Sequence, residues 1–235
     1  MINYLIFDGK PTTEWGASIS GVNTFNAPER AVNGVAVPGM NGKLTEDLGY
    51  FNNIMVEYPS FIQKDMTEKL EDLRAFFTSR KGYKRLEDTY HPNHFRRALF
   101  IGGLEATPLG YNNKMAEFTL QFDCDPRRFL KSGEQWEEHA GSFTIYNPTY
   151  FEAQPILRTT GKGSIFVNGH QIDVLNNSDA YIEIDTEINE AYVAESSRNN
   201  LVKFYDEKTS LQEGANAVTF TGFSKVSVQP RWWTL

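Results

Sequence analysis

The sequence predicts a mainly β protein with one amphipathic helix, organised as two domains. Three features lead to this prediction: a strict apolar–polar alternation near residue 120, one segment with helical periodicity, and a second half of short apolar runs separated by turn residues. With 235 residues, 40% of them hydrophobic and 14% aromatic, the chain has enough apolar material for one large or two small cores.

The first 25 residues predict two short strands. One apolar run lies at the start and another spans residues 15–22, ending at Val22. Between them, Asp8, Gly9 and Pro11 are typical of a turn.

Residues 29–50 predict a projecting β-hairpin arm. Asn-Gly pairs at 33–34 and 41–42 provide the two successive positive-φ positions of a type I′ turn, and a Pro-Gly pair at 38–39 interrupts the apolar stretch between them. The segment has few large side chains to bury by itself. We therefore expect it to extend away from the domain that carries it.

A helix is predicted over about residues 61–79. Its apolar side chains recur at the 3.6-residue period, whereas Lys64, Glu68, Glu71 and Arg74 face away. The apolar stripe consists of Ile62, Met66, Leu70, Leu73 and Phe77. Ser60 and Gln63 have the spacing of a capping box, and Gly82 follows a cationic last turn. Such a helix is expected to lie on a sheet in a structural role.

Residues 115–124 predict a half-buried antiparallel strand. One of its faces is apolar and consists of Ala116, Phe118, Leu120, Phe122 and Cys124. We expect Cys124, the single cysteine, to be a buried and inert thiol. The acidic, aperiodic stretch 131–141 then marks a boundary between domains 1–135 and 136–235.

The second half predicts a β-sandwich of about 95 residues. Short apolar runs alternate with turn residues, and Asn168-Gly169 is typical of a tight hairpin turn. The expected strands span residues 165–167, 172–175, 181–185, 201–205, 217–220 and 226–228.

Charge and motifs argue against several classes of function. A formal charge of -7 disfavours stable nucleic-acid binding, and no apolar run approaches the roughly 18 residues of a membrane span. The start of the chain lacks a secretory signal, so folding in a cytoplasm is expected. No metalloprotease, nucleophile-elbow or dinucleotide-binding motif occurs, and Asp88, His91 and His94 fit a solvated loop better than a metal site. We expect no enzyme activity, metal or cofactor.

The last residues leave two functions open. If the chain stays extended beyond Val226, Trp232 faces the core, whereas Trp233 and Arg231 share a wet face. That pair could anchor a subunit interface or stack on a sugar ring. Glu183 and Asp185 share one strand face, which we expect to be solvated; a hydrolase built on such a carboxylate pair has no motif behind it.

An ordered series of motifs along nearly the whole chain resembles the distal tail (Dit) proteins of long, non-contractile-tailed bacteriophages that infect Gram-positive bacteria. The series consists of Val37-Pro38-Gly39-x-Asn41-Gly42, the helix ending near Phe77, Arg85-Leu86-Glu87-Asp88, the strand 118–126 with Asp125-Pro126-Arg127-Arg128-Phe129, the segment 147–155, and Pro230-Arg231-Trp232-Trp233.

This resemblance implies an N-terminal β-sandwich with the helix and the arm, and a C-terminal galectin-like β-sandwich. Family members form a hexameric ring in which the arms interlock. The ring joins the major tail tube protein to a tail-associated tip protein and to receptor-binding or baseplate proteins, without catalysis and without a cofactor. The implied oligomerisation residues are Asn33, Gly34, Val37, Pro38, Gly39, Met40, Asn41 and Gly42.

Further implications concern location and contacts. The ring would lie at the tail tip of the virion after assembly in the host cytoplasm. DNA would pass through it without binding stably, and no membrane partner is expected. Met40 stands where the family often has arginine, so apolar contact between arms is expected there. No inserted carbohydrate-binding module fits this chain. The alternative is a carbohydrate-binding, lectin-like tail or cell-surface adhesion module that uses Arg231, Trp233 and nearby tyrosines.

Overall fold

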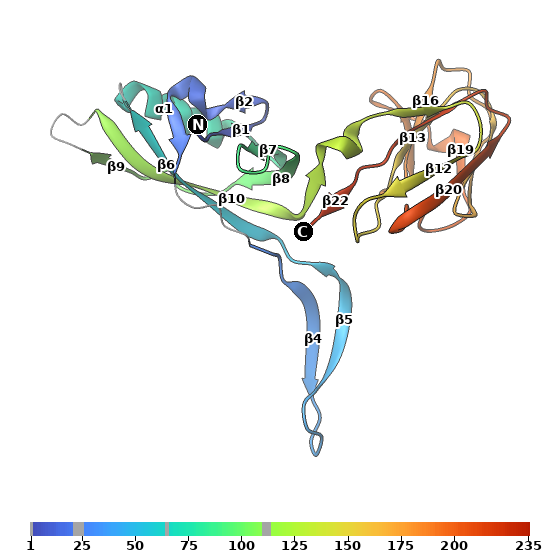
Figure 1. The fold of residues 1–235 in the computed structure, drawn as a ribbon, viewed down its shortest axis with the longest axis horizontal. Coiled ribbons are helices and arrows are strands. Elements are labelled where there is room, and N and C mark those ends of the chain that lie inside the picture. The colour runs from blue at the N-terminus through green and yellow to red at the C-terminus, as the bar shows by residue number, and fades with distance from the viewer. Residues whose placement is uncertain (1, 21–25, 64–65, 110–113) are drawn as a thin grey trace. The chain divides into compact units, whose positions relative to one another are not determined.

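The computed structural model describes residues 2–20, 26–63, 66–109 and 114–235 (Figure 1). Two compact units divide the chain: unit 1 ends at Arg128, and unit 2 runs from Phe129 to Thr234. The described residues are mainly β with one α-helix. None of the described helices has the length and hydropathy needed to cross a lipid bilayer.

Unit 1 contains the long strand β10 and the helix α1. Its elements are β1 (Leu5–Phe7), β2 (Lys10–Pro11), η1 (Thr12–Trp15), β3 (Ala17–Ile19), β4 (Arg30–Ala36), β5 (Lys43–Phe51), β6 (Ile54–Gln63), α1 (Met66–Ser79), β7 (Lys84–Asp88), β8 (His94–Phe100), β9 (Ala106–Leu109) and β10 (Met115–Leu130). The predicted strand at 15–22 corresponds to β3, and Val22 lies outside the described residues.

One continuously hydrogen-bonded sheet forms the frame of unit 1. Its strand order is β2-β1-β7-β8-β10-β6-β3, and β9 also pairs with β10. The N-terminal β-sandwich that the resemblance implies thus takes the form of a single sheet with α1 packed on it (Figure 1). The alternation predicted for residues 115–124 is confirmed, because every residue of its apolar face is buried.

Aromatic rings fill the space between the sheet and the helix. Phe7 on β1 lies 5.3 Å, centroid to centroid, from both Phe77 on α1 and Phe122 on β10. Leu73 on the same helix face is completely buried. The burial predicted for Cys124 is confirmed, and this burial raises the pKa of its thiol to about 12.

The helix begins later than the sequence predicts. Ser60, Ile62 and Gln63 belong to β6, so the predicted capping box and the first position of the helical stripe are wrong; Lys64 lies outside the described residues. The reason is that β6 pairs with β10 as far as Gln63 opposite Met115. Ile62 is completely buried on this strand, and an inward position satisfies the strand and the helix pattern equally well.

Unit 2 is a sandwich of two antiparallel sheets. Their strand orders are β11-β21-β13-β16-β17-β18 and β12-β20-β14-β15-β19. The elements are η2 (Lys131–Glu134), β11 (Glu137–His139), β12 (Phe143–Asn147), β13 (Ile156–Thr159), β14 (Gly163–Val167), β15 (His170–Val174), β16 (Ile182–Asp185), β17 (Glu190–Val193), β18 (Ser196–Ser197), η3 (Asn199–Leu201), β19 (Val202–Phe204), β20 (Gly214–Thr221), β21 (Val226–Gln229) and β22 (Trp233–Thr234).

The core of unit 2 lies between these sheets. Leu157, Ile165 and Ile182 are completely buried in one cluster. The tight turn predicted at Asn168-Gly169 is confirmed, since both residues have positive φ, 51° and 91°. The stretch 131–141, predicted as the boundary between domains, belongs to this unit: η2 and β11 occupy most of it, and β11 pairs with β21.

We expect Leu73→Ala to lower the free energy of unfolding of unit 1 by about 3 kcal/mol, because it leaves a cavity beneath α1. Denaturant unfolding followed by Trp fluorescence measures the loss. Glu71→Ala on the exposed face of the same helix is the control and should change stability by less than about 0.5 kcal/mol. Equal stability of the two variants would contradict the packing of α1 on the sheet.

Candidate functional site

The arm consists of β4 and β5, which pair only with each other among the described strands. The register runs from Ala36 opposite Lys43 to Val32 opposite Asp47, with an irregularity between Arg30 and Val32. Apart from Ala31 and the half-buried Phe51, every residue of these strands is exposed. In Figure 1 the arm leaves the sheet of unit 1 as a ribbon of its own. Along most of its length the arm is therefore not packed against the rest of the described residues.

The first predicted turn of the arm is wrong. Asn33 and Gly34 lie within β4, opposite Glu46 and Thr45, and neither has positive φ. The glycine has a different use, because a Cβ atom there would lie 3.2 Å from Cδ of Lys43. Its missing side chain makes room for the lysine stem of the partner strand.

The tip of the arm is a Pro-Gly turn. The Met40 N–H donates a hydrogen bond to the Val37 carbonyl oxygen at 3.1 Å. Pro38 occupies the second position of this turn and Gly39, with φ of 83°, the third, which is the residue choice of a type II turn. Asn41 does not have positive φ, so the predicted type I′ turn at Asn41-Gly42 is also wrong.

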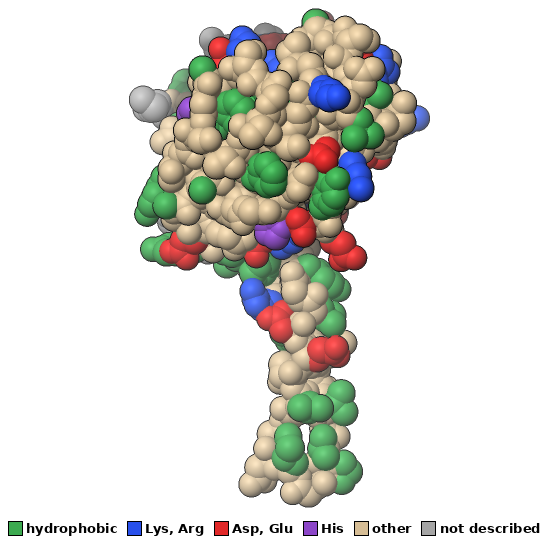
Figure 2. Space-filling model, turned by 90° about the vertical axis from the view of Figure 1, so that its right-hand side faces the viewer, with side chains coloured by type: hydrophobic (Ala, Val, Ile, Leu, Met, Phe, Trp, Pro, Cys, Tyr) green, Lys and Arg blue, Asp and Glu red, His purple; other side chains and the backbone are tan. Residues whose placement is uncertain are grey.

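Apolar side chains are exposed along the whole arm. Val35 and Leu44 face each other across the two strands and are 58% and 62% exposed. Figure 2 shows hydrophobic side chains gathered towards the far end of the arm. The exposed apolar residues of the arm are Val32, Val35, Val37, Met40, Leu44, Leu48 and Tyr50. A concentration of this kind is typical of a surface that another protein covers.

Polar contacts hold the base of the arm. Asp47 accepts a hydrogen bond from the Gly49 N–H at 2.9 Å and pairs with the Arg30 guanidinium, and these contacts lower the pKa of its carboxyl group. The guanidinium also lies over the Phe51 ring, 5.0 Å from its centroid. These contacts lie at the irregular part of the register and fix the path of the chain where the arm begins.

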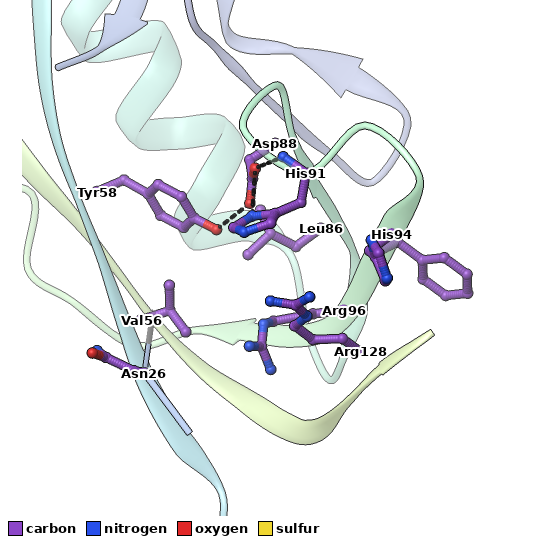
Figure 3. A pocket seen from close by; sticks show the side chains of 10 residues that line it. Asn26, Val56, Tyr58, Leu86, Asp88, His91, His94, Arg96 and Arg128 are labelled. Atoms are coloured by element: carbon purple, nitrogen blue, oxygen red, sulfur yellow. Dashed lines mark hydrogen bonds and ion pairs between the residues drawn. The ribbon is translucent and has the colours of Figure 1, made fainter. Parts of the chain in front are cut away.

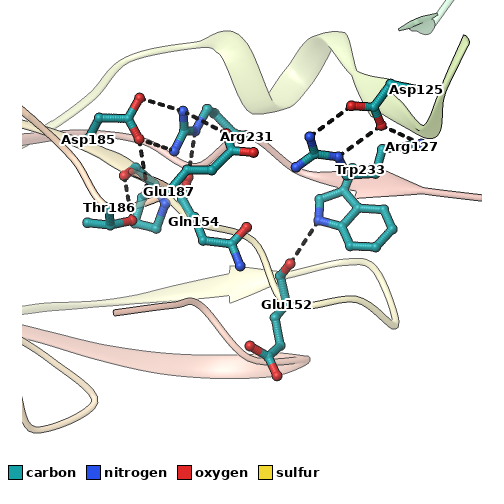
Figure 4. A network of polar contacts seen from close by, with 10 residues as sticks. Asp125, Arg127, Glu152, Gln154, Asp185, Thr186, Glu187, Arg231 and Trp233 are labelled. Atoms are coloured by element: carbon teal, nitrogen blue, oxygen red, sulfur yellow. Dashed lines mark hydrogen bonds and ion pairs between the residues drawn. The ribbon is translucent and has the colours of Figure 1, made fainter. Parts of the chain in front are cut away.

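Arg231 and Trp233, the predicted interface or glycan residues, are engaged inside unit 2 (Figure 4). Arg231 donates two hydrogen bonds, of 2.9 and 2.7 Å, to Asp185 and one to the Gln154 carbonyl oxygen, and its side chain is 11% exposed. Its φ of 57° shows that the chain bends there, so the extended path assumed for residues 226–233 is wrong. Trp233 donates from Nε1 to the Glu152 carbonyl oxygen at 2.8 Å.

The core position of Trp232 is confirmed, since it is 5% exposed. Glu183 and Asp185 are wrongly predicted as a solvated face: their side chains are 16% and 12% exposed, and each pairs with an arginine, Glu183 with Arg158. An intermolecular role for Arg231 and Trp233 stays a prediction.

The loop with Asp88, His91 and His94 is not solvated as predicted. Asp88 accepts hydrogen bonds from the Tyr58 hydroxyl at 2.9 Å and the His91 backbone N–H at 2.8 Å, and its side chain is 13% exposed. Within the part of the chain that the structure describes, no three metal-ligating side chains come together. The alternation along β7 could have predicted the burial of Asp88, because it follows the buried Leu86 by two residues and so shares its face.

We expect Arg231→Met to lower the free energy of unfolding by about 3 to 5 kcal/mol, because it leaves the Asp185 carboxylate buried without its charge partner. Chemical denaturation measures the loss. Lys225→Met is the matched control: it removes an ion pair with Glu138 that is about half exposed, which costs about 1 kcal/mol or less. Similar losses in both variants would show that Arg231 does not hold unit 2 together.

Neither a scan against protein-family models nor a search of curated proteins gives a match for this sequence. Solved structures do match. The SPP1 Dit protein (gp 19.1), a paradigm of the hub adsorption apparatus in phages that infect Gram-positive bacteria, is similar over 100% of both chains, with a TM-score of 0.76 and 12% identity. Chains of the phage P2 baseplate in its activated conformation, with Ca and with Sr, match over 97% of both chains, with TM-scores of 0.55 and 0.53 and identities of 12% and 11%. The chain therefore has the Dit fold over its whole length, as the resemblance in its sequence predicts.

Proposed function

We propose that this protein is the hub of a phage tail tip, a hexameric ring whose interlocked arms form a belt. The ring joins the major tail tube protein to the tail-associated tip protein and to baseplate or receptor-binding proteins. The fold shared with the SPP1 Dit protein and with chains of the P2 baseplate supports this function. The observation that carries it is the arm, whose apolar side chains are exposed and whose strands pair only with each other among the described strands.

The physical chemistry of the arm favours contact with other copies. A two-stranded ribbon is marginally stable alone, and here both partners of the cross-strand pair Val35 and Leu44 remain exposed. An arm that packs on the next copy makes a head-to-tail contact, and such contacts close into a ring when the rotation between neighbours allows it. Met40 at the tip would contribute apolar contact between neighbouring arms, where the family often has arginine.

The proposed location is the tail tip of the virion, with assembly in the cytoplasm of the host. The role is structural and not enzymatic. The carboxylates that could have served a hydrolase, Glu183 and Asp185, are both paired with arginines, which supports a structural reading of that sheet. We do not favour the lectin alternative, because Arg231 and Trp233 already use their polar groups within unit 2.

We expect Val35→Glu with Leu44→Glu, or deletion of residues 33–43, to yield a folded monomer, because charges or loss of the tip prevent burial of the arm. Light scattering measures the mass, and negative-stain microscopy of the unmodified protein should show rings with a central hole. Ile188→Glu in unit 2 is the control, since that side chain is 59% exposed but lies outside the arm. An arm variant that assembles like the unmodified protein would overturn the proposal.

We expect the ring to bind double-stranded DNA weakly or not at all near physiological salt. Six copies, each with a formal charge of -7, carry -42 together, and such a field opposes stable phosphate contacts. Fluorescence anisotropy with a labelled duplex, in a salt series, measures the affinity. Submicromolar binding that falls steeply as salt rises would count against a channel through which DNA slides.

A further inference from the structure

A small cavity in unit 1 is lined by more positively charged than negatively charged side chains. Its volume is about 40 Å³, enough for one small ion or a few water molecules. Strands β6, β7, β8 and β10 contribute to its wall (Figure 3). The lining residues are Asn26, Val56, Tyr58, Leu86, Asp88, His91, His94, Phe95, Arg96 and Arg128.

The carboxylates near this cavity already have partners. Both oxygens of Asp88 are engaged: Oδ2 accepts from the Tyr58 hydroxyl, and Oδ1 accepts from the His91 backbone N–H and lies 3.2 Å from Nδ1 of the same histidine. Asp125, close by on β10, accepts hydrogen bonds from the backbone and guanidinium of Arg127 at 2.8 to 3.0 Å. Neither carboxylate is hydrogen-bonded to Arg96 or Arg128 among the described contacts.

The two arginines lie side by side in the cavity (Figure 3). Arg96 reaches only the carbonyl oxygens of Asp125 and Pro126 among the described residues, at the long distances of 3.5 and 3.4 Å. Nε of Arg128 is buried and has no hydrogen-bond partner in the part of the chain that the structure describes. Two half-buried guanidinium groups repel each other, and an unsatisfied buried donor costs free energy, so this arrangement lacks an acceptor.

The positive charge of Arg128 contributes to the pKa shifts of His94 and Arg96. The pKa of His94 is lowered, first by its burial and then by the charge of Arg128. The pKa of Arg96 is also lowered, mainly by burial and to a smaller extent by the charge of Arg128, although Cys124, Tyr58 and Asp88 oppose this effect. An anion placed between the guanidinium groups would offset the part of both shifts that comes from the charge of Arg128.

We propose that this cavity, the Arg96–Arg128 site, binds a carboxylate group. A carboxylate matches the planar, paired donors of guanidinium groups and would accept from the unpartnered Arg128 Nε. The volume admits a group of formate size but not a sugar or a nucleotide. The carboxylate comes either from a small molecule or from an acidic side chain of another copy, and Glu46 on the exposed arm is the candidate for the second source.

Formate titration into the full chain tests the site, with NMR of the His94 imidazole as the readout. Saturable binding in the millimolar range should raise the pKa of His94, since formate offsets the charge of Arg128. Arg128→Gln should weaken formate binding at least about tenfold. Arg97→Gln, which removes the same charge from the exposed face of β8, should leave it unchanged.

The source of the carboxylate follows from one further variant. If Glu46 of a neighbouring copy occupies the site, Glu46→Gln should raise the formate affinity of the assembled protein; if a small molecule does, the affinity should not change. Should Arg128→Gln fail to fold, Arg128→Lys keeps the charge but loses the paired donors, and weaker binding is again expected. No saturable formate effect on His94 in the unmodified protein, or equal binding in the Arg97 and Arg128 variants, would overturn the proposal.

Discussion

Pairing between β6 and β10 is the interaction on which the rest of unit 1 depends. It runs without interruption from Gln63 opposite Met115 to Ile54 opposite Cys124. The arm enters β6 at one end and the helix follows its other end, so both are positioned by this register. A slip of one residue would turn Phe118 and its neighbours on the buried face towards solvent. The hydrophobic alternation of β10 thereby also sets the direction in which the arm leaves the sheet.

The apolar side chains of the arm and those of the unit 1 core differ in their burial. Phe7, Phe77 and Phe122 pack against one another and are buried within one chain, whereas Val35 and Leu44 face each other but stay exposed. What steadies the arm in one copy is its own ladder of backbone hydrogen bonds and the polar contacts at its base. Contact with another molecule would bury the apolar side chains of such a segment and so lower the free energy.

Local periodicity predicts the elements whose burial alternates simply, such as β10, the helix face around Leu73 and the strands of unit 2. It fails where pairing with another strand determines which element a residue belongs to. Ile62 fits a strand and a helix equally well, and only β10 assigns it to the strand. Asn33 belongs to a turn-forming pair, but the register with β5 places it inside a strand. The bend at Arg231 and the cavity beside Asp88 depend on partners that lie 46 and 30 residues away, which no local pattern contains.

Unit 2 begins and ends at the same place. The Leu130 N–H donates to the Trp232 carbonyl oxygen and the Arg231 N–H to the Gly133 carbonyl oxygen, both at 2.8 Å. At Gly133 a Cβ atom would lie 2.3 Å from the backbone nitrogen of Trp232, so only glycine permits this approach. The residues at the start of unit 2 therefore lie beside those near its end. Adjacent termini of this kind are typical of modules that tolerate circular permutation or insertion into another chain.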